Sequence, residues 1–468
     1  MRGESVSPVK FSDLMSGLPQ IWPEDLLPSI RERIALLDGK LIVLDDDPTG
    51  CQTVHDVPLY TGWEEESLRS ALREESHVVY ILTNSRSLLP DEAAELARTI
   101  GQRLSKLSEE LKVKLFLVSR SDSTLRGHFP TETNALAEGL SMSFDATFII
   151  PFFLEGGRYT VNDAHWVRQG EMMIPAAQTE YARDPAFGYI HSYLPKWVEE
   201  KTGGMVKEDE VERISIWELR KEGPEKLSRR LMELEGGRIV IVNAADYRDL
   251  DVLSLALLDA EISGKRFLYR TAASFVRSRG GITPGGVLSG EELLPQTDTE
   301  PGALVIVGSY VGRTTRQMQK LLEMPDTIGI EVRIADLLGG ERGKTIDRIT
   351  RKIEEMIKKG LIAVLFTERK PVKGFTPEES LKIGRRISSA LAEITRGLNA
   401  RPSFILAKGG ITSHDIAVKG LGISRTMVLG QIYPGVPVWK VKDIPYVVFP
   451  GNVGDDEAMV EVVRKLRP

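Results

Sequence analysis

The first feature of the sequence that could do chemistry is a run of three adjacent carboxylates. Residues 45–50 read Asp-Asp-Asp-Pro-Thr-Gly and directly follow the apolar run 41–44. Carboxylates this close repel one another unless a cation or an array of hydrogen-bond donors meets them, and clusters of oxygen ligands suit Mg²⁺. The alternative is a solvated turn that caps the following segment. The run therefore indicates a loop that binds a cation or a ligand.

A second candidate loop, residues 119–128, reads Ser-Arg-Ser-Asp-Ser-Thr-Leu-Arg-Gly-His and follows the apolar run 114–118. Arginine forks match carboxylates and phosphates with two hydrogen bonds, and serine, threonine and aspartate are partners for hydroxyl groups. A helix N-terminus with its caps would explain the hydroxyl residues but not both arginines. The inventory is that of a site for a small polyhydroxy acid.

Small residues dominate three loops of the second half of the chain, residues 308–315, 408–413 and 450–456. Small residues at the start of a helix let a phosphate approach backbone N–H groups and the positive end of the helix dipole. Any tight strand-to-helix turn can have this composition, so one such loop indicates little. Three of them in one half of the chain indicate a phosphate site.

Two other patterns give weaker indications of function. Residues 339–345 resemble a phosphate-binding P-loop, but the required spacing places a glycine at position 338, where the sequence has leucine. A helix start is the better interpretation of this segment. The six histidines show no metal-binding spacing, and Cys51 has no neighbour that marks it as a nucleophile.

The elements that must position these loops are short apolar strands separated by longer amphipathic stretches. Strand-like runs occupy residues 41–45, 78–82, 114–118, 147–150 and 238–242, and the same pattern returns at 303–309, 361–366 and 403–410. Residues 91–112 place apolar side chains at helical spacing. Alternation of this kind predicts α/β architecture with doubly wound, mostly parallel sheets, in which ligands bind beyond the carboxyl ends of the strands.

The chain is expected to form two such α/β domains. Residues 279–302 hold six glycines and three prolines in 24 positions, which is typical of a linker. The sequence therefore predicts a leader at 1–37, a first domain at 38–280, a linker at 281–302 and a second domain at 303–468.

Composition narrows the class of protein. The 468 residues carry 61 Lys plus Arg and 67 Asp plus Glu, a net charge of −6, and 41% are hydrophobic. This is the composition of a globular protein, and the acidic balance argues against a nucleic-acid partner. No apolar run is long enough for a membrane helix, and the N-terminus lacks the apolar core of a signal peptide. A single cysteine fits a reducing compartment, so we expect a cytoplasmic enzyme with small-molecule partners and no membrane partner.

Taken together, these motifs resemble the four-carbon acid sugar kinases. Residues 45–50 are similar to the family's A-D-D-x-T-G, and residues 120–127, Arg-Ser-Asp-Ser-Thr-Leu-Arg-Gly, are similar to its K-x-D-S-T-L-R-G. Weaker similarities, in the family's order, lie at 157–160, 179–184, 308–309, 433–437 and 450–454. Arg120 in place of lysine and Ile411 in place of an acidic residue depart from the pattern.

The resemblance implies an N-terminal sugar-acid domain, a C-terminal nucleotide domain, and ATP-dependent phosphorylation of erythronate, threonate or a 3-oxo-tetronate. Asp46 and Asp47 would orient the acceptor hydroxyl, take its proton, or hold Mg²⁺, with Asp47 as the metal contact. The expected sugar-acid residues are Arg120, Asp122, Ser123, Arg126 and Arg158. The expected nucleotide residues are Ser309, Gly409, Gly410, Ile411, Thr412, Gly451 and Gly454.

Two other functions stay open at this point. Asp45-x-Asp47-x-Thr49 after an apolar strand also resembles the nucleophile motif of haloacid-dehalogenase-type phosphatases, although that interpretation leaves residues 122–127 unexplained. A non-catalytic sugar-acid sensor would need only the first domain and fits the glycine-rich loops poorly. The sequence leaves the stereochemistry of the acid and any homo-oligomer undetermined.

Overall fold

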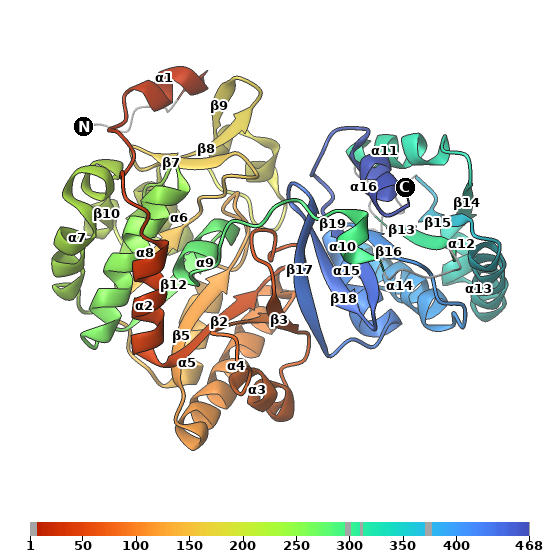
Figure 1. Cartoon of the computed structure of the whole chain (residues 1–468), viewed down its shortest axis with the longest axis horizontal. Helices are drawn as coiled ribbons and strands as arrows, with labels where there is room; N and C mark the ends of the chain where they lie inside the picture. The colour runs from red at the N-terminus through yellow and green to blue at the C-terminus, as the bar shows by residue number, and fades with distance from the viewer. Residues whose placement is uncertain (1–6, 295–300, 309–311, 370–376, 468) are drawn as a thin grey trace. The chain divides into compact units, whose positions relative to one another are not determined.

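The computed structural model describes residues 7–294, 301–308, 312–369 and 377–467. The chain divides into two units (Figure 1). Unit 1 contains residues 1–53 and 62–284, and unit 2 contains residues 54–61 and 285–468. The second unit therefore includes a short segment from the first half of the chain.

Unit 1 is built on a parallel sheet. In spatial order its strands are β10 (Glu212–Ile214), β11 (Arg238–Val242), β6 (Ala146–Ile150), β12 (Phe267–Thr271), β5 (Lys114–Arg120), β2 (Gly39–Asp45) and β4 (Val78–Leu82). Runs of Val, Ile and Leu form these strands because both faces of the sheet are covered: all five residues of β4 are buried, as is 41–45 of β2.

Helices cover this sheet in two groups. Helices α3 (Glu65–Leu72), α4 (Pro90–Leu111) and α5 (Thr131–Leu140) pack together, and α2 (Leu27–Leu37), α7 (Gly223–Met232), α8 (Tyr247–Ile262) and α9 (Ala273–Arg279) form the other group. The two groups lie on opposite sides of the strands (Figure 1). The helical spacing noted at 91–112 is α4, whose Ala97, Ile100 and Leu104 are buried.

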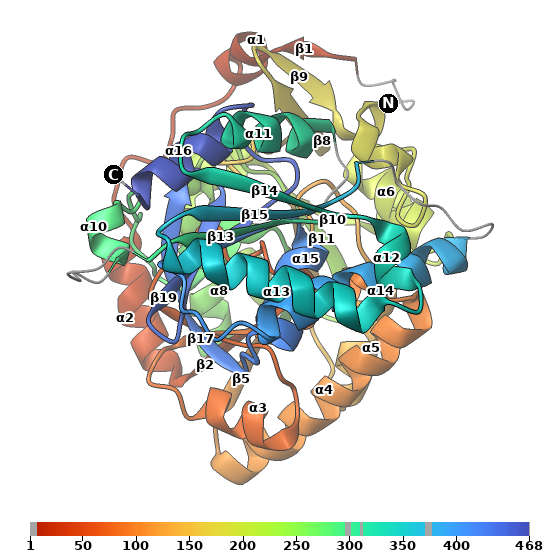
Figure 2. The same cartoon turned by 90° about the vertical axis from the view of Figure 1, so that its right-hand side faces the viewer.

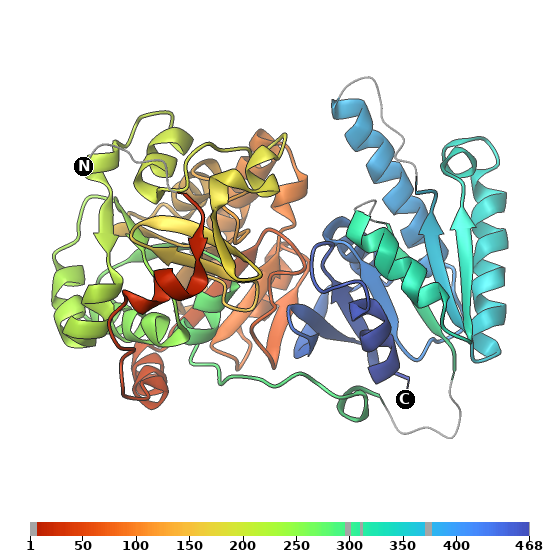
Figure 3. The same cartoon turned by 90° about the horizontal axis from the view of Figure 1, so that it is seen from above.

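Unit 1 also carries a small antiparallel sheet, ordered β1 (Val9–Lys10), β9 (Met172–Pro175), β8 (Ala164–Gln169) and β7 (Arg158–Val161) (Figure 3, β7–β9 in yellow). Strand β1 thus lies within the segment expected to be a leader. The remaining helices of the unit are α1 (Phe11–Ser16), α6 (Leu194–Lys201), η1 (Ser85–Ser87), η2 (Ala176–Gln178), η3 (Glu180–Arg183), η4 (Glu208–Glu210) and η5 (Glu218–Glu222).

Unit 2 has a mixed sheet. Its strands are β3 (Val57–Tyr60), β17 (Arg425–Tyr433), β18 (Val436–Val441), β19 (Ile444–Phe449), β16 (Ile405–Lys408), β13 (Ala303–Val307), β15 (Ile362–Thr367) and β14 (Thr327–Val332). The last five are parallel neighbours, whereas β3, β17, β18 and β19 pair antiparallel. A buried core cluster forms from apolar residues of β13, β15, β18 and β19 with helices α11 and α16.

The helices of unit 2 are α10 (Gly290–Leu293), α11 (Gly312–Leu322), α12 (Ile334–Leu338), α13 (Arg342–Lys358), α14 (Pro377–Arg396), α15 (Gly410–Asp415), η6 (Ile416–Gly420) and α16 (Ala458–Lys465). Helices α11 and α16 pack together, as do α13 and α14 (Figure 2). Helix α13 begins within the P-loop-like segment, as the alternative interpretation expected.

The predicted fold class is confirmed, with antiparallel pairs added at one side of the second sheet. The predicted domain limits stay a prediction; they place the segment 54–61 in the first domain, whereas in the structure it groups with unit 2. In the part of the chain that the structure describes, no helix is both long and apolar enough to cross a membrane.

Candidate functional site

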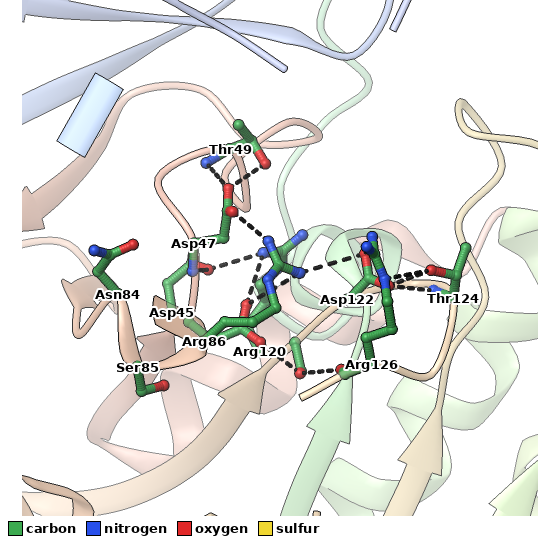
Figure 4. A network of polar contacts seen from close by, with 12 residues as sticks. Asp45, Asp47, Thr49, Asn84, Ser85, Arg86, Arg120, Asp122, Thr124 and Arg126 are labelled. Carbon is green, nitrogen blue, oxygen red and sulfur yellow. Dashed lines mark hydrogen bonds and ion pairs between the residues drawn. The ribbon is translucent and has the colours of Figure 1, made fainter. Parts of the chain in front are cut away.

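The register of the parallel strands in unit 1 aligns the loops that the sequence singled out. Asp45 of β2 lies opposite Leu82 of β4 and Arg120 of β5, and Arg120 lies opposite Thr271 of β12. The carboxyl ends of four strands therefore meet at one edge. Polar side chains from the loops after β2, β4 and β5 converge there (Figure 4).

The three adjacent carboxylates of this edge have different partners. Asp45 Oδ1 accepts a hydrogen bond of 2.9 Å from Arg120 Nη1, and Asp46 Oδ2 accepts one of 2.7 Å from Ser121. Asp47 accepts from Arg86 and from the backbone N–H of Thr49, the latter at 2.8 Å. These donors offset part of the repulsion that the sequence indicated.

Burial separates these carboxylates further. The side chains of Asp45, Asp46 and Asp47 are 0%, 2% and 15% exposed. Burial raises the pKa of Asp45 to about 7 although Arg120 opposes it. Burial also acts to raise the pKa of Asp47, but Arg86 and the hydrogen bonds from Thr49 outweigh it and hold that pKa below its usual value. Asp47 is therefore a charged carboxylate and the most accessible member of the run.

A glycine allows this arrangement. A Cβ added at Gly50 would overlap both carboxylate oxygens of Asp45 and the Nη1 of Arg120. The glycine of the motif therefore lets the loop fold back over the buried ion pair.

Arg86, which the sequence analysis did not single out, connects the loops. It lies in η1, directly after β4, where Asn84 adopts a left-handed conformation with φ of 51°. Its Nη2 donates to Asp47, and its Nη1 lies 3.3 Å from Asp122 Oδ1. The available signal was the polar segment 83–87 after an apolar strand, the same signal that marked the other two loops.

Asp122 and Arg126 form an ion pair through two hydrogen bonds. Arg126 Nε and Nη2 donate to the two oxygens of Asp122 at 2.8 and 3.2 Å, and Nη1 lies 3.5 Å from Asp184. Burial acts to raise the pKa of Asp122, but Arg126 and Arg86 outweigh it and hold that pKa well below its usual range. The fork of Arg126 is thus directed at Asp122 in this structure.

The other expected sugar-acid residues surround this pair. The guanidinium carbons of Arg126 and Arg158 lie 5.2 and 5.5 Å from the centroid of the Tyr181 ring. Ser123 is buried, and its carbonyl oxygen lies 2.7 Å from His165 Nε2. Arg120 lies beneath the acidic run, so it supports the site from the interior.

Two further buried residues escaped the sequence analysis. Glu132, in the first turn of α5, accepts a 2.6 Å hydrogen bond from Ser85 Oγ, next to Arg86. Burial, reinforced by the charge of Asp46, raises the pKa of Glu132 to about 7. Arg270, near the end of β12, donates to the backbone carbonyl of Arg126 at 3.1 Å. Neither follows a strand as part of a polar cluster, so the sequence offers no comparable signal for them.

In unit 2 the structure brings the three small-residue loops together. A Cβ at Gly308 would overlap Thr412 Oγ1, and Thr314 Oγ1 lies 3.4 Å from the carbonyl oxygen of Gly451. Gly410 and Ile411 begin α15, and Gly454 follows in the loop after β19 with φ of 77°. Ser309 lies outside the described residues.

Lys408 joins the ends of two strands beneath these loops. It is fully buried, its Nζ donates to the carbonyl oxygen of Pro450 at 2.7 Å, and Gly409 N–H donates to Phe449 at 2.9 Å. Burial, with the nearby charge of Arg313, lowers the pKa of Lys408 to about 6. The lysine was part of the loop that the sequence analysis quoted, but its anchoring role depends on tertiary contacts.

Hydrogen-bond donors surround Asp47, the expected Mg²⁺ contact. Among the described residues, no group of three His, Cys, Asp or Glu side chains could hold a metal ion. Both carboxylate oxygens of Asp47 are engaged, one by Thr49 and the other by Arg86. Asp47 as a metal contact stays a prediction.

Two family models match two successive parts of the chain. Residues 41–279 match a family model described as a sugar-binding N-terminal domain. Residues 304–459 match one described as a nucleotide-binding C-terminal domain.

Two curated relatives are similar to most of the chain. A 3-oxo-tetronate kinase of Pseudomonas savastanoi pv. phaseolicola is 24% identical over 364 residues, 74% of this chain and 78% of that protein. A D-threonate kinase of Bordetella bronchiseptica is 25% identical over 420 residues, 87% of this chain and 91% of the relative.

Two solved structures share the fold. A Salmonella typhimurium protein superposes with a TM-score of 0.67 at 17% identity, covering 92% of this chain and 100% of that chain. A Haemophilus influenzae protein gives a TM-score of 0.59 at 18% identity, covering 91% and 100%. At these identities the likeness concerns the fold alone.

Proposed function

Because the chain belongs to the four-carbon acid sugar kinase family, we propose that it transfers the terminal phosphoryl group of ATP to a hydroxyl of erythronate, threonate or a 3-oxo-tetronate. The observation that carries the proposal is the strand edge of unit 1. There the charged Asp47 and Asp122 alternate with Arg86 and Arg126. Such a surface offers both cations and hydroxyl acceptors to a small polyhydroxy acid.

Phosphoryl transfer needs positioning and charge neutralisation more than covalent chemistry from the protein. Asp47 would accept a hydrogen bond from the reacting hydroxyl and then its proton, because its carboxylate is charged and the most exposed of the three. Asp46, which accepts a hydrogen bond from Ser121, would support Asp47 by holding the acidic loop in place. Asp122, Ser123, Arg126 and Arg158 would surround the acid, and Arg120 would hold the loop from beneath.

The nucleotide would bind in unit 2. Ser309, Gly409, Gly410, Ile411, Thr412, Gly451 and Gly454 are the proposed contacts. The close approach of Gly308 to Thr412 and of Thr314 to Gly451 supports a common phosphate site. ATP would act as its magnesium complex; no side chain is assigned to the ion. Action in the cytoplasm stays a prediction from composition.

The phosphatase alternative requires Asp45 as an exposed nucleophile. Asp45 is instead fully buried, and it is paired with Arg120. A buried, ion-paired carboxylate cannot reach a phosphate ester, so the arrangement disfavours this function.

An assay of ADP formation tests the proposal. We expect ADP only when Mg²⁺, ATP and a four-carbon acid are all present, and we expect no phosphate release from generic phosphate esters. Ester hydrolysis without ATP, or ADP formation that does not depend on any four-carbon acid, would contradict the kinase assignment.

A further inference from the structure

The loop that follows β5 directs its charged side chains to the candidate site and packs against the interior with the rest. The side chains of Asp122 and Arg126 are 14% and 23% exposed and pair with each other at the site (Figure 4). Between them in the chain, Leu125 is buried in an apolar cluster with Val167 and Tyr189. The loop therefore has one face that can meet a ligand and one face that the interior holds.

The backbone of this loop needs support from outside it. Leu125 has φ of 69°, in the left-handed region that a leucine rarely adopts, and Gly127 has φ of 118°. A residue other than glycine persists in this region only where the surrounding structure fixes it, and such residues cluster at functional sites. A Cβ at Gly127 would also lie 2.6 Å from Ser121 Oγ, so the loop folds back closely on its own start.

His165 holds one carbonyl of the loop from beneath. It lies on β8 and is fully buried, and its Nε2 donates to the carbonyl oxygen of Ser123 at 2.7 Å. Its Nδ1 lies 3.0 Å from Oγ1 of Thr160, the residue opposite it on β7. Burial lowers the pKa of His165 to about 4, so the ring is neutral near pH 7. Because a carbonyl oxygen can only accept, the ring proton is assigned to Nε2, and Thr160 donates to Nδ1.

Tyr189 holds the next carbonyl along the chain. Its side chain is buried, and its hydroxyl donates to the carbonyl oxygen of Thr124 at 2.8 Å, closer than the carbonyl oxygen of Ala176 at 3.4 Å. A third carbonyl, that of Arg126, accepts from Arg270 of β12 at 3.1 Å. Buried side chains from β8, from β12 and from the segment 184–193 thus hold three carbonyls of one loop.

We propose that His165 and Tyr189 are positioning residues for the acid site: by holding two successive carbonyls of the loop, they keep the Asp122 carboxylate directed at a hydroxyl of the sugar acid. The inference rests on the proposed function and deepens it. A loop that is fixed before the ligand arrives loses less conformational entropy on binding, which strengthens binding. The small antiparallel sheet thereby gains a task, because β7 and β8 carry Thr160 and His165.

Tyr189→Phe tests the second of these contacts, since it removes one hydroxyl and keeps the ring. We expect the KM for the acid to rise about 3- to 10-fold and the KM for ATP to stay within about 2-fold of wild type, because only the acid loop loses a hydrogen bond. Steady-state kinetics with erythronate, threonate and a 3-oxo-tetronate measures both constants for each acid that the wild-type chain phosphorylates.

Tyr446→Phe in unit 2 is the matched control. It also removes a buried hydroxyl that donates to a backbone carbonyl, that of Ser413, at 2.6 Å. The KM for the acid should not change in this variant.

His165→Met and His165→Gln separate the hydrogen bond from the packing. The two replacement side chains have the same length, but only the amide can both donate to the Ser123 carbonyl and accept from Thr160. We expect the methionine variant to raise the KM for the acid about 5- to 30-fold, because it leaves the buried carbonyl without its donor. The glutamine variant should restore most of this loss.

A merely structural role of the two residues gives a different result. Each variant would then melt at a lower temperature, while its folded fraction would keep the wild-type KM for the acid. That result in Tyr189→Phe would overturn the inference even if neither His165 variant folds. Equal KM values for the acid in His165→Met and His165→Gln would overturn it too. A wild-type chain that phosphorylates none of the three acids would instead contradict the proposed function, and the inference would fall with it.

Discussion

At the scale of single residues, burial assigns different tasks to chemically identical groups. Asp45, Asp46 and Asp47 are consecutive, yet one is an interior ion-pair partner and one faces the site as a charged carboxylate. The pKa values of Asp45 and Asp47 move in opposite directions because only Asp47 receives both a guanidinium and the Thr49 donors. The position of the run at a strand end could be predicted, whereas this division of roles could not.

Asp47→Asn tests the proposed catalytic role. The amide keeps the size of the side chain but cannot take a proton, so we expect turnover to fall by about 10²- to 10⁴-fold. Affinities for the acid and for ATP should stay within about 3-fold of wild type, because the binding residues are unchanged. Steady-state kinetics and calorimetry check this. Asp91→Asn, an exposed position in the first turn of α4, is the control and should have normal kinetics.

Glu132→Gln tests the buried carboxyl behind Arg86. Its pKa is about 7 in the folded chain, above the usual 4.5, so between these values the folded state holds a proton that the unfolded state has released. The wild-type free energy of unfolding therefore decreases as pH rises through this window. The variant lacks this decrease. Between pH 4.5 and 7 its free energy of unfolding should therefore rise by about 2–4 kcal/mol relative to that of wild type.

Urea denaturation at several pH values measures this difference. Glu138→Gln, on the same helix but paired with Arg98 at the surface, should show no such pH-dependent gain. A difference between Glu132→Gln and wild type that stays constant with pH would contradict the assignment.

At the scale of elements, the ends of the parallel strands position most of the residues of the candidate site. The apolar runs could be recognised because both faces of each sheet are covered, and their register then aligned the loops after β2, β4 and β5. Arg270 was missed for a physical reason: it is a lone arginine whose contact with the Arg126 carbonyl only the tertiary structure shows. Arg86, by contrast, lies in the polar segment 83–87, which carried a signal that the sequence analysis did not use. The family resemblance supplied the functional class, and the comparisons confirmed it.

Lys408→Met tests the connection between β16 and β19. The folded lysine has a pKa of about 6, below its usual 10.5, so between these values the unfolded state holds a proton that the folded state lacks. Wild-type stability should therefore rise with pH across this window, and the variant should lose that rise.

We also expect ATP affinity to fall, because the loop after β19 loses its anchor at Pro450. Lys465→Met is the control: this exposed lysine also donates to a backbone carbonyl, that of Ile432, at 2.9 Å. Denaturation at pH 6.5, 7.5 and 8.5 measures the slope for both variants, and equal slopes in Lys408→Met and wild type would refute the assignment.

At the scale of the whole molecule, unit 2 is assembled from two distant parts of the chain. Strand β3 pairs antiparallel with the first residues of β17, and Thr61 adds hydrogen bonds from its backbone and side chain to Ser424 and Ile423. The sequence analysis did not predict β3, because its four residues include a proline and its partner lies far along the chain. Covalently, the acidic loop is therefore continuous with a strand of the nucleotide unit.

Leu59→Ala tests this assembly in the full chain. Leu59 is fully buried in β3, so its truncation should destabilise unit 2 by about 2–5 kcal/mol although the residue belongs to the first half of the sequence. Hydrogen exchange should show lost protection at residues 425–428 with α4 unchanged. Leu104→Ala, a buried position on α4, should give the reverse pattern.

The membership of β3 in unit 2 also sets an order of events during synthesis. A ribosome adds about 5–20 residues per second, so roughly 20–70 s pass between the emergence of β3 and that of its partner β17. All four residues of β3 are buried in the finished fold, so this nascent segment exposes apolar surface throughout that interval. Pro58 lacks a backbone N–H and so limits pairing with the wrong strand. The N-terminal half of the polypeptide thus leaves the ribosome with one unpaired strand. The proline in that strand limits its pairing with other strands until β17 has been made.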